Sequence, residues 1–396
     1  MQPLTGSIKR YDWGSVDAIP RLLGIPVDGQ PVAEYWLGAH PLGVSQLNGG
    51  TALDKAIESD PSMIGDSARH EFGGRLPYLV KLLSAARPLS LQAHPNLADA
   101  QAGYERENRV QLPIDSPERT YRDPWDKPEL IIALTQFEAL AGFRDPKVTA
   151  DLLSRLGIAP HTETLFAPLR HRSPAAGLAE VFLDCLVLDE ERRGAVTDVV
   201  TAAVHHLDAQ GELGEFARTA VLLDEHFPGD PSLLAALLLN RRNLQPGEAL
   251  HLRPGTMHAY LSGTGVEVMG SSDNVLRGGL TNKHIDASAL VQVVDFTPQQ
   301  MPVLRPDKEA PGLWHYMAGE RAFATWRIDA APGRMIELPA ELSGRILLVT
   351  SGEVGLSTGP DGLILQCGQS AFIGASEQVW ASGDGQAFLV ATGMDA

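Results

Sequence analysis

Hydrophobic and polar positions follow different periods in different parts of the chain. Over residues 1–144, short apolar runs alternate with turns rich in Gly and Pro, which predicts short strands. The pattern then changes, because Asp145 followed by Pro146 is a typical helix start and Gly157 a typical stop. The 3.6-residue period of a helix is carried by Leu152, Leu153 and Leu156, then by Val196, Val199, Val200, Ala203, Val204 and Leu207, and finally by Phe216, Ala220, Leu223 and Phe227. We therefore predict a helical insert over residues 146–240.

From Asn240 the strand pattern returns, together with a weak internal repeat. Residues 244–250 (Leu-Gln-Pro-Gly-Glu-Ala-Leu) resemble residues 365–371 (Leu-Gln-Cys-Gly-Gln-Ser-Ala), and residues 262–265 resemble residues 382–385 at nearly the same offset. Similar turn chemistry between short strands predicts two related β-barrels of the jelly-roll type in one chain. The predicted fold class is therefore mainly β with an α-helical insert.

Composition excludes some classes of partner. The chain has 396 residues, long enough for two or three domains, and 44% of them are apolar. Its 32 basic and 49 acidic residues give a net charge of −17, which argues against a general surface for nucleic acid or for an anionic membrane. A phosphorylated ligand would need a local basic pocket.

The number of cysteines and the lengths of the apolar runs indicate the cellular compartment of the protein. Cys185 and Cys367 are too few for a disulfide framework and have no metal-motif neighbours. Residues 1–10 lack the apolar stretch of an export signal, and the longest apolar run, residues 233–239, is too short to span a bilayer. We expect a soluble, cytoplasmic protein with reduced cysteines.

Four metal donors lie in or beside apolar strands. Gln92 and His94 stand at i and i+2, so in an extended segment both side chains leave the same face. Glu129 opens another apolar strand, and His258 lies in a third. Two imidazoles, one carboxylate and one amide oxygen suit zinc, with manganese, iron or cobalt as substitutes. Such a set leaves room for a water or a substrate oxygen, as a catalytic site requires.

The repeat and the donors together give a domain division. Residues 1–145 with 241–300 are predicted to form the metal-binding barrel, residues 146–240 a helical domain, and residues 301–396 a second barrel. In the second copy the position of His258 falls near Val379. The C-terminal barrel is therefore predicted to lack a metal site and to serve for packing or covering.

Six segments in the order of a known family carry a specific resemblance. The chain resembles the type I mannose-6-phosphate isomerases, zinc enzymes with cupin-like barrels. The resemblance implies one Zn²⁺ per chain and interconversion of mannose 6-phosphate and fructose 6-phosphate. The matching segments are Tyr-Asp-Trp-Gly-Ser at 11–15, Glu-Tyr-Trp-Leu-Gly-Ala-His-Pro at 34–41, Ser-Leu-Gln-Ala-His-Pro at 90–95, Lys-Pro-Glu at 127–129, Gly-Thr-Met-His-Ala-Tyr at 255–260 and Ser-Asp-Asn-Val-Leu-Arg-Gly-Gly-Leu-Thr-Asn-Lys at 272–283.

An aldose–ketose isomerase moves a proton between C1 and C2 of the sugar through an enediol. It therefore needs a base, an electrophile for the enediol oxygen and residues that bind the phosphate. Zinc would be the electrophile or would orient the two sugar oxygens. As in the family, Arg277 would stabilise the developing enediolate with a permanent positive charge. Lys283 is the better candidate for the phosphate, together with Ser90 and Lys81.

The base has three candidates in the sequence: Lys127, Glu267 and a zinc-bound water. Lys127 precedes a ligand by two residues, so an extended segment aims it to the metal's side. Glu267 follows the turn-like residues 262–265, and a hairpin there would return it to the site, so Glu267 is favoured. Tyr260 is predicted to contact the substrate. The family commonly has histidine where this chain has Asp126, so any role of that histidine is lost or passes to another residue.

Two other functions remain open. A sugar-phosphate sensor would keep the pocket without turnover, but a binder has no need of a base beside the metal. An isomerase or epimerase of a different sugar is the second alternative, because spacing alone does not fix hydroxyl stereochemistry. A small-molecule sugar phosphate is the expected partner. The oligomeric state is not readable from the sequence, although a monomer is plausible.

Overall fold

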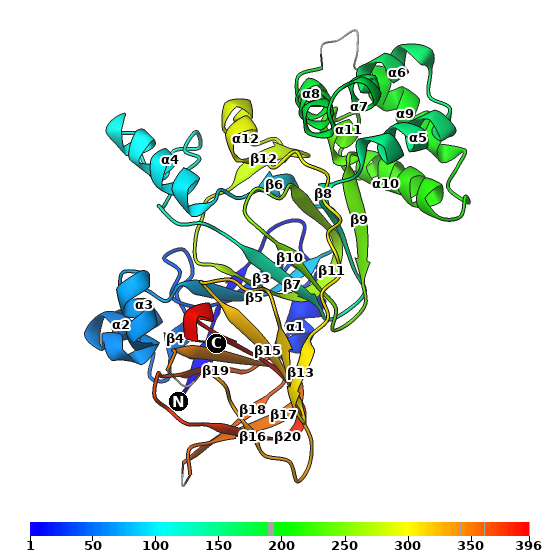
Figure 1. Ribbon diagram of the computed structural model, residues 1–396. Helices are drawn as coiled ribbons and strands as arrows, with labels where there is room; N and C mark the ends of the chain where they lie inside the picture. The colour runs from blue at the N-terminus through cyan, green and yellow to red at the C-terminus, as the bar shows by residue number, and fades with distance from the viewer. Residues whose placement is uncertain (189–193, 341, 360, 396) are drawn as a thin grey trace.

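Two antiparallel sheets contain the strands of the computed structural model, which describes residues 1–188, 194–340, 342–359 and 361–395 (Figure 1). The first sheet contains, in spatial order, β13 (Asp307–Ala310), β14 (Leu313–Tyr316), β15 (Ala324–Ala330), β20 (Trp380–Ala391), β17 (Arg345–Ser357), β19 (Ser370–Ile373), β1 (Gln2–Thr5) and β4 (Gln46–Leu47), with β16 (Ile336–Glu337) beside β20 and β18 (Gly362–Gln366) beside β17. The second contains β10 (Ala249–Leu252), β7 (Glu129–Ala133), β11 (His258–Gly270), β5 (Tyr78–Ala85), β3 (Glu34–Leu37) and β2 (Ser7–Lys9), with β6 (Leu91–Ala93) between β11 and β12 (Leu276–Gly279), β8 (Phe137–Phe143) beside β11, and β9 (Leu239–Leu244) beside β8. The prediction of a mainly β protein with helices is confirmed.

Alternation along the strands separates a packing face from a polar face in the second sheet. Val266 and Val268 of β11 belong to a buried cluster that also contains Leu348 of β17 and Phe388 of β20, so the two sheets pack against each other. Glu267 lies between the two valines and points to the opposite face. The same period in β5 and β7 places Lys81 and Glu129 on the same face as Glu267. We call this face of the second sheet the inner face.

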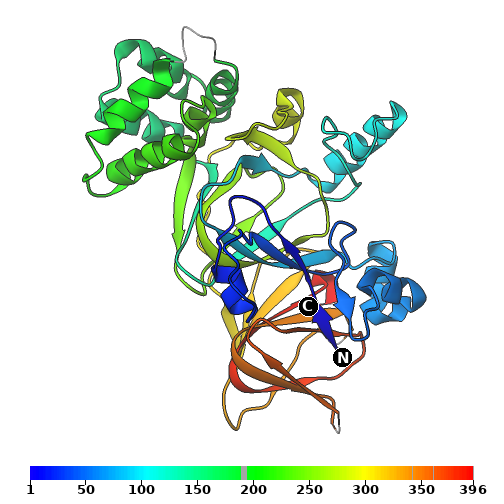
Figure 2. The same ribbon diagram turned by 180° about the vertical axis from the view of Figure 1, so that it is seen from behind.

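The N-terminal segment takes part in both sheets. β1 pairs with β19 in the register Gln2 to Phe372 and Leu4 to Ser370, and its other edge pairs with β4 through Leu4 and Leu47. β2 then joins the second sheet through β3. Figure 2 shows the blue first strand among the orange and red strands, with the two chain ends close together.

Helices cluster between β8 and β9 and are drawn in green in Figure 1. Among the described residues they are α5 (Pro146–Leu156), α6 (Pro160–Phe166), α7 (Pro168–His171), α8 (Pro174–Leu186), α9 (Gly194–Val204), α10 (Glu212–His226) and α11 (Ser232–Ala236). α5 begins and ends as predicted, because the Asp145 carboxylate accepts from the Lys147 amide and Gly157 is left-handed with φ 78°. The cluster packs on the barrel through a shared core that includes Phe143 and Phe182.

Other helices of the described residues lie outside that cluster. They are α1 (Ala18–Leu22), α2 (Leu53–Ser59), α3 (Gly65–Glu71), α4 (Leu97–Arg109) and α12 (Ala287–Val293), with 3₁₀ turns η1 (Pro61–Ile64) and η2 (Gly393–Asp395). Of the helices in the described parts of the chain, none is both long enough and apolar enough to cross a bilayer.

The sequence repeat has a counterpart in the backbone. Gly247, in the turn between β9 and β10, has φ 85°, and its repeat partner Gly368, between β18 and β19, has φ 84°. Gly263 in β11 has φ 120°, and Gly383 in β20 has φ 128°. The expectation of a turn around Gly263 is wrong, because β11 runs through it as one strand of 13 residues. A register shift between β11 and β8 lies near this glycine, and its unusual φ bends the strand without reversing it.

Candidate active site

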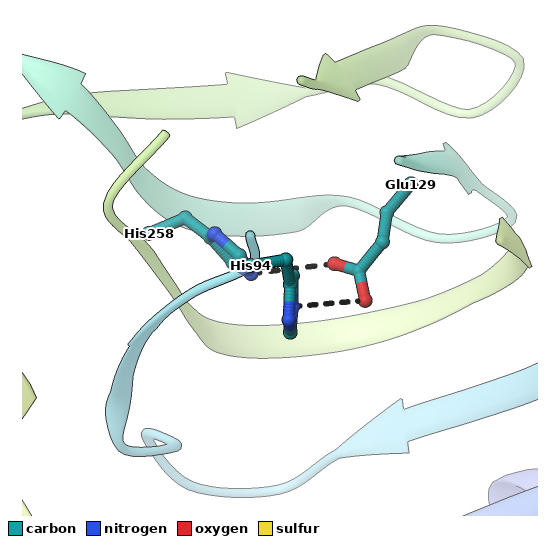
Figure 3. Close-up of side chains that lie close together, drawn as sticks. All are labelled: His94, Glu129 and His258. Carbon is teal, nitrogen blue, oxygen red and sulfur yellow. Dashed lines mark ion pairs between the residues drawn. The ribbon is translucent and has the colours of Figure 1, made fainter. Parts of the chain in front are cut away.

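Three of the predicted donors converge at one end of the inner face (Figure 3). His94 Nε2 lies 3.2 Å from Glu129 Oε1, and His258 Nε2 lies 3.3 Å from Glu129 Oε2. The ligand atoms of all three lie within 4.8 Å of one another, and each residue is buried. Of all the described residues, only these three form a His, Cys, Asp or Glu cluster with that spacing.

Backbone contacts orient both imidazoles toward the carboxylate. His94 Nδ1 is 2.7 Å from the carbonyl oxygen of Asn274, and His258 Nδ1 is 2.9 Å from that of Thr256. A carbonyl oxygen only accepts, so each Nδ1 carries the proton and donates. Each Nε2 then presents a lone pair to the carboxylate, unless the ring is doubly protonated.

Burial opposes that second proton at His94. Burial, together with the positive charge of Lys127, lowers the pKa of His94 to about 4. The Nε2 atoms of both histidines and Glu129 Oε2 are buried without a hydrogen-bond partner. Two lone pairs and a carboxylate facing each other repel unless a cation lies between them, so the residues fit a divalent metal ion.

Lys127 and Glu129 share one side of an extended segment. Pro128 lies between them and disfavours helical backbone at Lys127, so positions i and i+2 point the same way. Lys127 Nζ lies 3.2 Å from Glu129 Oε1. Burial alone would raise the pKa of Glu129, but His94 and Lys127 outweigh it and hold that pKa well below its usual range. Glu129 is therefore an anion at neutral pH.

Gln92 lies in the same strand ladder as two other predicted site residues. It is the register partner of His258 on one side and of Arg277 on the other. Directly opposed residues of antiparallel strands share a face, so the three side chains form a row across β11, β6 and β12. His94 follows two positions after Gln92 and points to the same side. The register thus brings the predicted amide ligand beside the histidines.

Glu267 is held by two donors on the inner face. Lys81 Nζ donates to Glu267 Oε2 at 2.9 Å, and the Tyr260 hydroxyl donates to Oε1 at 2.9 Å. Burial raises the pKa of Glu267, the positive charge of Lys81 opposes that shift, and the negative charge of Glu129 adds to it. The bend of β11, rather than the expected hairpin, lets Tyr260 and Glu267 of one strand meet.

Lys81 is placed with carboxylates rather than in an open basic pocket. It is 6% exposed, and its Nζ also lies 3.6 Å from Glu34 Oε1. Burial would lower the pKa of Lys81, but Glu267 and Glu34 outweigh it and raise that pKa above its usual value. Its positive charge is therefore already balanced inside the protein.

Sequence reasoning did not single out several neighbours of Lys81. Trp36 lies beside it in the β3–β5 register, with Lys81 Nζ 5.1 Å from the ring centroid, and the Trp36 indole donates to Glu34 at 2.9 Å. His40 packs edge-on against Trp36, and its Nε2 lies 3.4 Å from Asp273 Oδ1. The segment at 34–41 had indicated the family resemblance. The i, i+2 spacing of Glu34 and Trp36 in an extended segment was the signal that they share one face.

Basic side chains gather at the Arg277 end of the row that His258, Gln92 and Arg277 form across the strands. Burial lowers the pKa of Arg277, and so does the positive charge of Arg122. Lys283 lies on the surface. The pKa of Lys283 is lowered by the burial of part of its side chain and by the positive charges of Arg277 and Arg122. Ser90 is partly buried in the loop before β6. The structure therefore gathers Arg277, Lys283 and the unpredicted Arg122 within electrostatic reach of one another.

Asp126 stands where the family commonly has histidine. Burial raises the pKa of Asp126, whose charged neighbours are Glu320, Arg75 and Arg321.

Known proteins share the sequence pattern and the fold of this chain. The family model for phosphomannose isomerase type I, catalytic domain, matches residues 1–146. The mannose-6-phosphate isomerase of Salmonella typhimurium is 38% identical over 396 residues, covering 98% of each chain, and that of Escherichia coli is 37% identical over 386 residues, covering 95% of each. A zinc-bound crystal structure of mannose 6-phosphate isomerase is similar with a TM-score of 0.89 at 36% identity, covering 99% of each chain.

The fold and the comparisons together assign the chain to a class of enzymes, the sugar-phosphate isomerases with antiparallel sheets. The chain belongs to the type I phosphomannose isomerase family. The resemblance inferred from the sequence motifs is confirmed.

Proposed function

We propose that this protein is a zinc-dependent aldose–ketose isomerase that interconverts mannose 6-phosphate and fructose 6-phosphate through an enediol. The observation that carries the proposal is the pair of unpartnered Nε2 atoms of His94 and His258 facing the Glu129 carboxylate. Family membership supplies the substrate, because the matched relatives are named mannose-6-phosphate isomerases.

His94, Glu129 and His258 would hold one zinc ion, and Gln92 would add an amide oxygen. The position of Gln92 beside His258 in the strand register supports its inclusion. The bound ion would supply Lewis-acid polarisation of the sugar oxygens. Lys127 would keep Glu129 ionised and oriented through their 3.2 Å contact.

For the proton transfer between C1 and C2, we favour Glu267 as the base. Burial raises the pKa of Glu267, which makes its carboxylate a stronger base than an exposed glutamate. Lys81 and Tyr260 each donate to one of its oxygens, and each carboxylate oxygen keeps a second lone pair for the substrate. Lys127 is the second candidate, but its Nζ already lies 3.2 Å from Glu129 Oε1.

The phosphate would bind at the basic end of the row. Lys283 is exposed and its neighbouring charges are positive, which favours an anion there. Ser90 is the proposed hydroxyl donor. Arg277 lies opposite Gln92 in the ladder, between the metal donors and Lys283, and would stabilise negative charge on the enediolate. We reassign Lys81 from the phosphate to the positioning of Glu267, since two carboxylates already surround it.

The domain division is also proposed here. Two jelly-roll barrels of the cupin kind are supported by the matching φ values of Gly247 with Gly368 and of Gly263 with Gly383. Residues 146–240 would form the helical domain and 301–396 the barrel without a metal, which β1 and β4 complete.

A direct assay tests the function. The purified protein is incubated with mannose 6-phosphate, and fructose 6-phosphate is measured before chelation, after chelation and after zinc is restored. We expect turnover that disappears with the metal and returns with it. Binding of the sugar phosphate without turnover would favour a sensor, turnover of another sugar alone would change the substrate, and turnover after complete metal removal would refute the metal's role.

A further inference from the structure

A fully buried asparagine, Asn274, connects His94 of the candidate metal site to the loop that precedes β7. Asn274 is 0% exposed, and its side-chain Oδ1 accepts from the Arg122 amide at 2.7 Å and from the Asp123 amide at 3.3 Å. Its Nδ2 donates to the carbonyl oxygens of Asp123 at 2.7 Å and of Trp125 at 2.9 Å. Its own carbonyl oxygen accepts from His94. One residue thus fixes both the loop and a metal ligand.

The loop is also fixed from its other side. The Glu107 carboxylate of α4 accepts from the Thr120 amide at 3.2 Å and from the Tyr121 amide at 2.9 Å. Buried Arg119 donates to the Tyr121 carbonyl oxygen at 2.8 Å. Arg122 follows directly, so its backbone lies between two anchored segments. Such a loop is rigid where it presents the Arg122 side chain.

The side chain of Arg122 belongs to a cluster of like charges. The charge of Arg122 lowers the pKa of both Arg277 and Lys283. Across the described residues, none of the three cations has a carboxylate within ion-pair distance. Three positive groups that repel each other without an internal counter-ion favour an external anion.

The strand register fixes how far this cluster lies from the metal donors. Arg277 is two strands from His258, with Gln92 between them, which is about 10 Å at the usual strand spacing. A span of this size is compatible with one sugar phosphate that has its reacting carbons near the metal donors and Arg277 and its phosphate on the rest of the cluster.

We infer that Arg122 binds the substrate phosphate together with Lys283, and that Asn274 is a positioning residue that holds Arg122 there. This inference rests on the proposed function for the identity of the substrate. Arg122 would offer paired N–H donors to the phosphate oxygens, which a lysine does not. The Asn274 side chain would act on phosphate binding through the loop, while its backbone carbonyl serves His94.

The first test removes the guanidinium. In Arg122→Met we expect KM for mannose 6-phosphate and the inhibition constant of inorganic phosphate to rise about tenfold to a hundredfold, as for loss of a charged hydrogen bond. We expect kcat to change far less. Arg122→Lys should recover part of the affinity. Arg334→Met, which removes an exposed charge from the other sheet, is the matched control and should change neither constant. Constants for Arg122→Met within twofold of the wild type would overturn the inference.

The second test asks whether Asn274 acts through Arg122. Asn274→Ala should raise KM with zinc content unchanged, because the His94 contact uses the backbone. In the double variant Asn274→Ala/Arg122→Met the two effects on KM should be less than multiplicative. Fully multiplicative effects would show that Asn274 does not position Arg122. If Asn274→Ala does not fold, the Arg122 variants still decide the phosphate assignment.

Failure of the proposed function can be told apart from failure of this inference. Calorimetric titration of the zinc-loaded wild type and Arg122→Met with inorganic phosphate needs no turnover. Weaker binding by the variant would support the cluster even if mannose 6-phosphate were not the substrate, and equal binding would refute it even if isomerase activity is found.

Discussion

Replacing Lys81 by methionine leaves two buried carboxylates without their cation. Glu267 and Glu34 are 3% and 7% exposed, and Lys81 Nζ lies 2.9 Å and 3.6 Å from them. At an effective dielectric constant of about 20, each of these attractions is worth about 5 kcal/mol before desolvation is counted. Loss of one partner from a buried pair typically costs about 3–5 kcal/mol. We expect Lys81→Met to lose that much stability at pH 8.

The size of this loss should depend on pH. The pKa of Glu267 is already raised in the folded protein, and removing Lys81 raises it further. For an acid with a raised folded-state pKa, stability is greatest below the unfolded pKa and falls as pH rises through the folded pKa. The destabilisation should therefore be smaller at pH 5 than at pH 8, because a raised pKa favours protonation of Glu267 at the lower pH.

Thermal unfolding of the zinc-loaded proteins, followed by circular dichroism, measures this effect. The entropy of unfolding is about 0.8 kcal/mol/K for 396 residues, so Tm should fall by about 4–6 °C at pH 8. Lys81→Met/Glu267→Gln removes the uncompensated charge and should recover much of the loss. An unchanged Tm at pH 8, or a larger loss at pH 5, would refute the reasoning. Either result would mean that water rather than Lys81 compensates Glu267.

Three further predictions concern the site. His258→Ala should strip the metal and abolish activity together, which elemental analysis and the isomerase assay measure; full zinc content would show that His258 is not a ligand. Lys283→Ala should chiefly raise KM for mannose 6-phosphate, because the contact exists in ground and transition states alike, and an unchanged KM would move the phosphate elsewhere. Tyr260→Phe removes a donor to Glu267, so the acidic limb of the pH profile of kcat/KM should shift to higher pH, and an unshifted limb would count against Glu267 as the base.

The placement of the four predicted metal donors followed from local rules. The i, i+2 spacing puts Gln92 and His94 on one face wherever the chain is extended, and Glu129 and His258 open strands that the apolar pattern marks. The start and end of α5 were equally local, since Asp145 and Gly157 act through their own backbone. Family resemblance then indicated that the separate segments meet.

The rest depends on pairings between distant segments. The turn-like residues around Gly263 occur inside a long strand, because β5 and β7 pair on either side of β11 and hold it extended. Asn274 looks like an ordinary loop residue until Arg122 and Asp123 are placed against it. The two carboxylates that pair with Lys81 come from β3 and β11. The residues next to Lys81 in the sequence therefore gave no sign that it is an internal counter-ion.

The pairing of β1 with β19 has a consequence for synthesis on the ribosome. Leu4 is made before its register partner Ser370, which follows 366 residues later. At about 5–20 residues per second, roughly 20–70 s pass before that partner exists. During this time the edge of β1 that will pair with β19 has no partner, so the nascent chain needs protection there from strand-to-strand association.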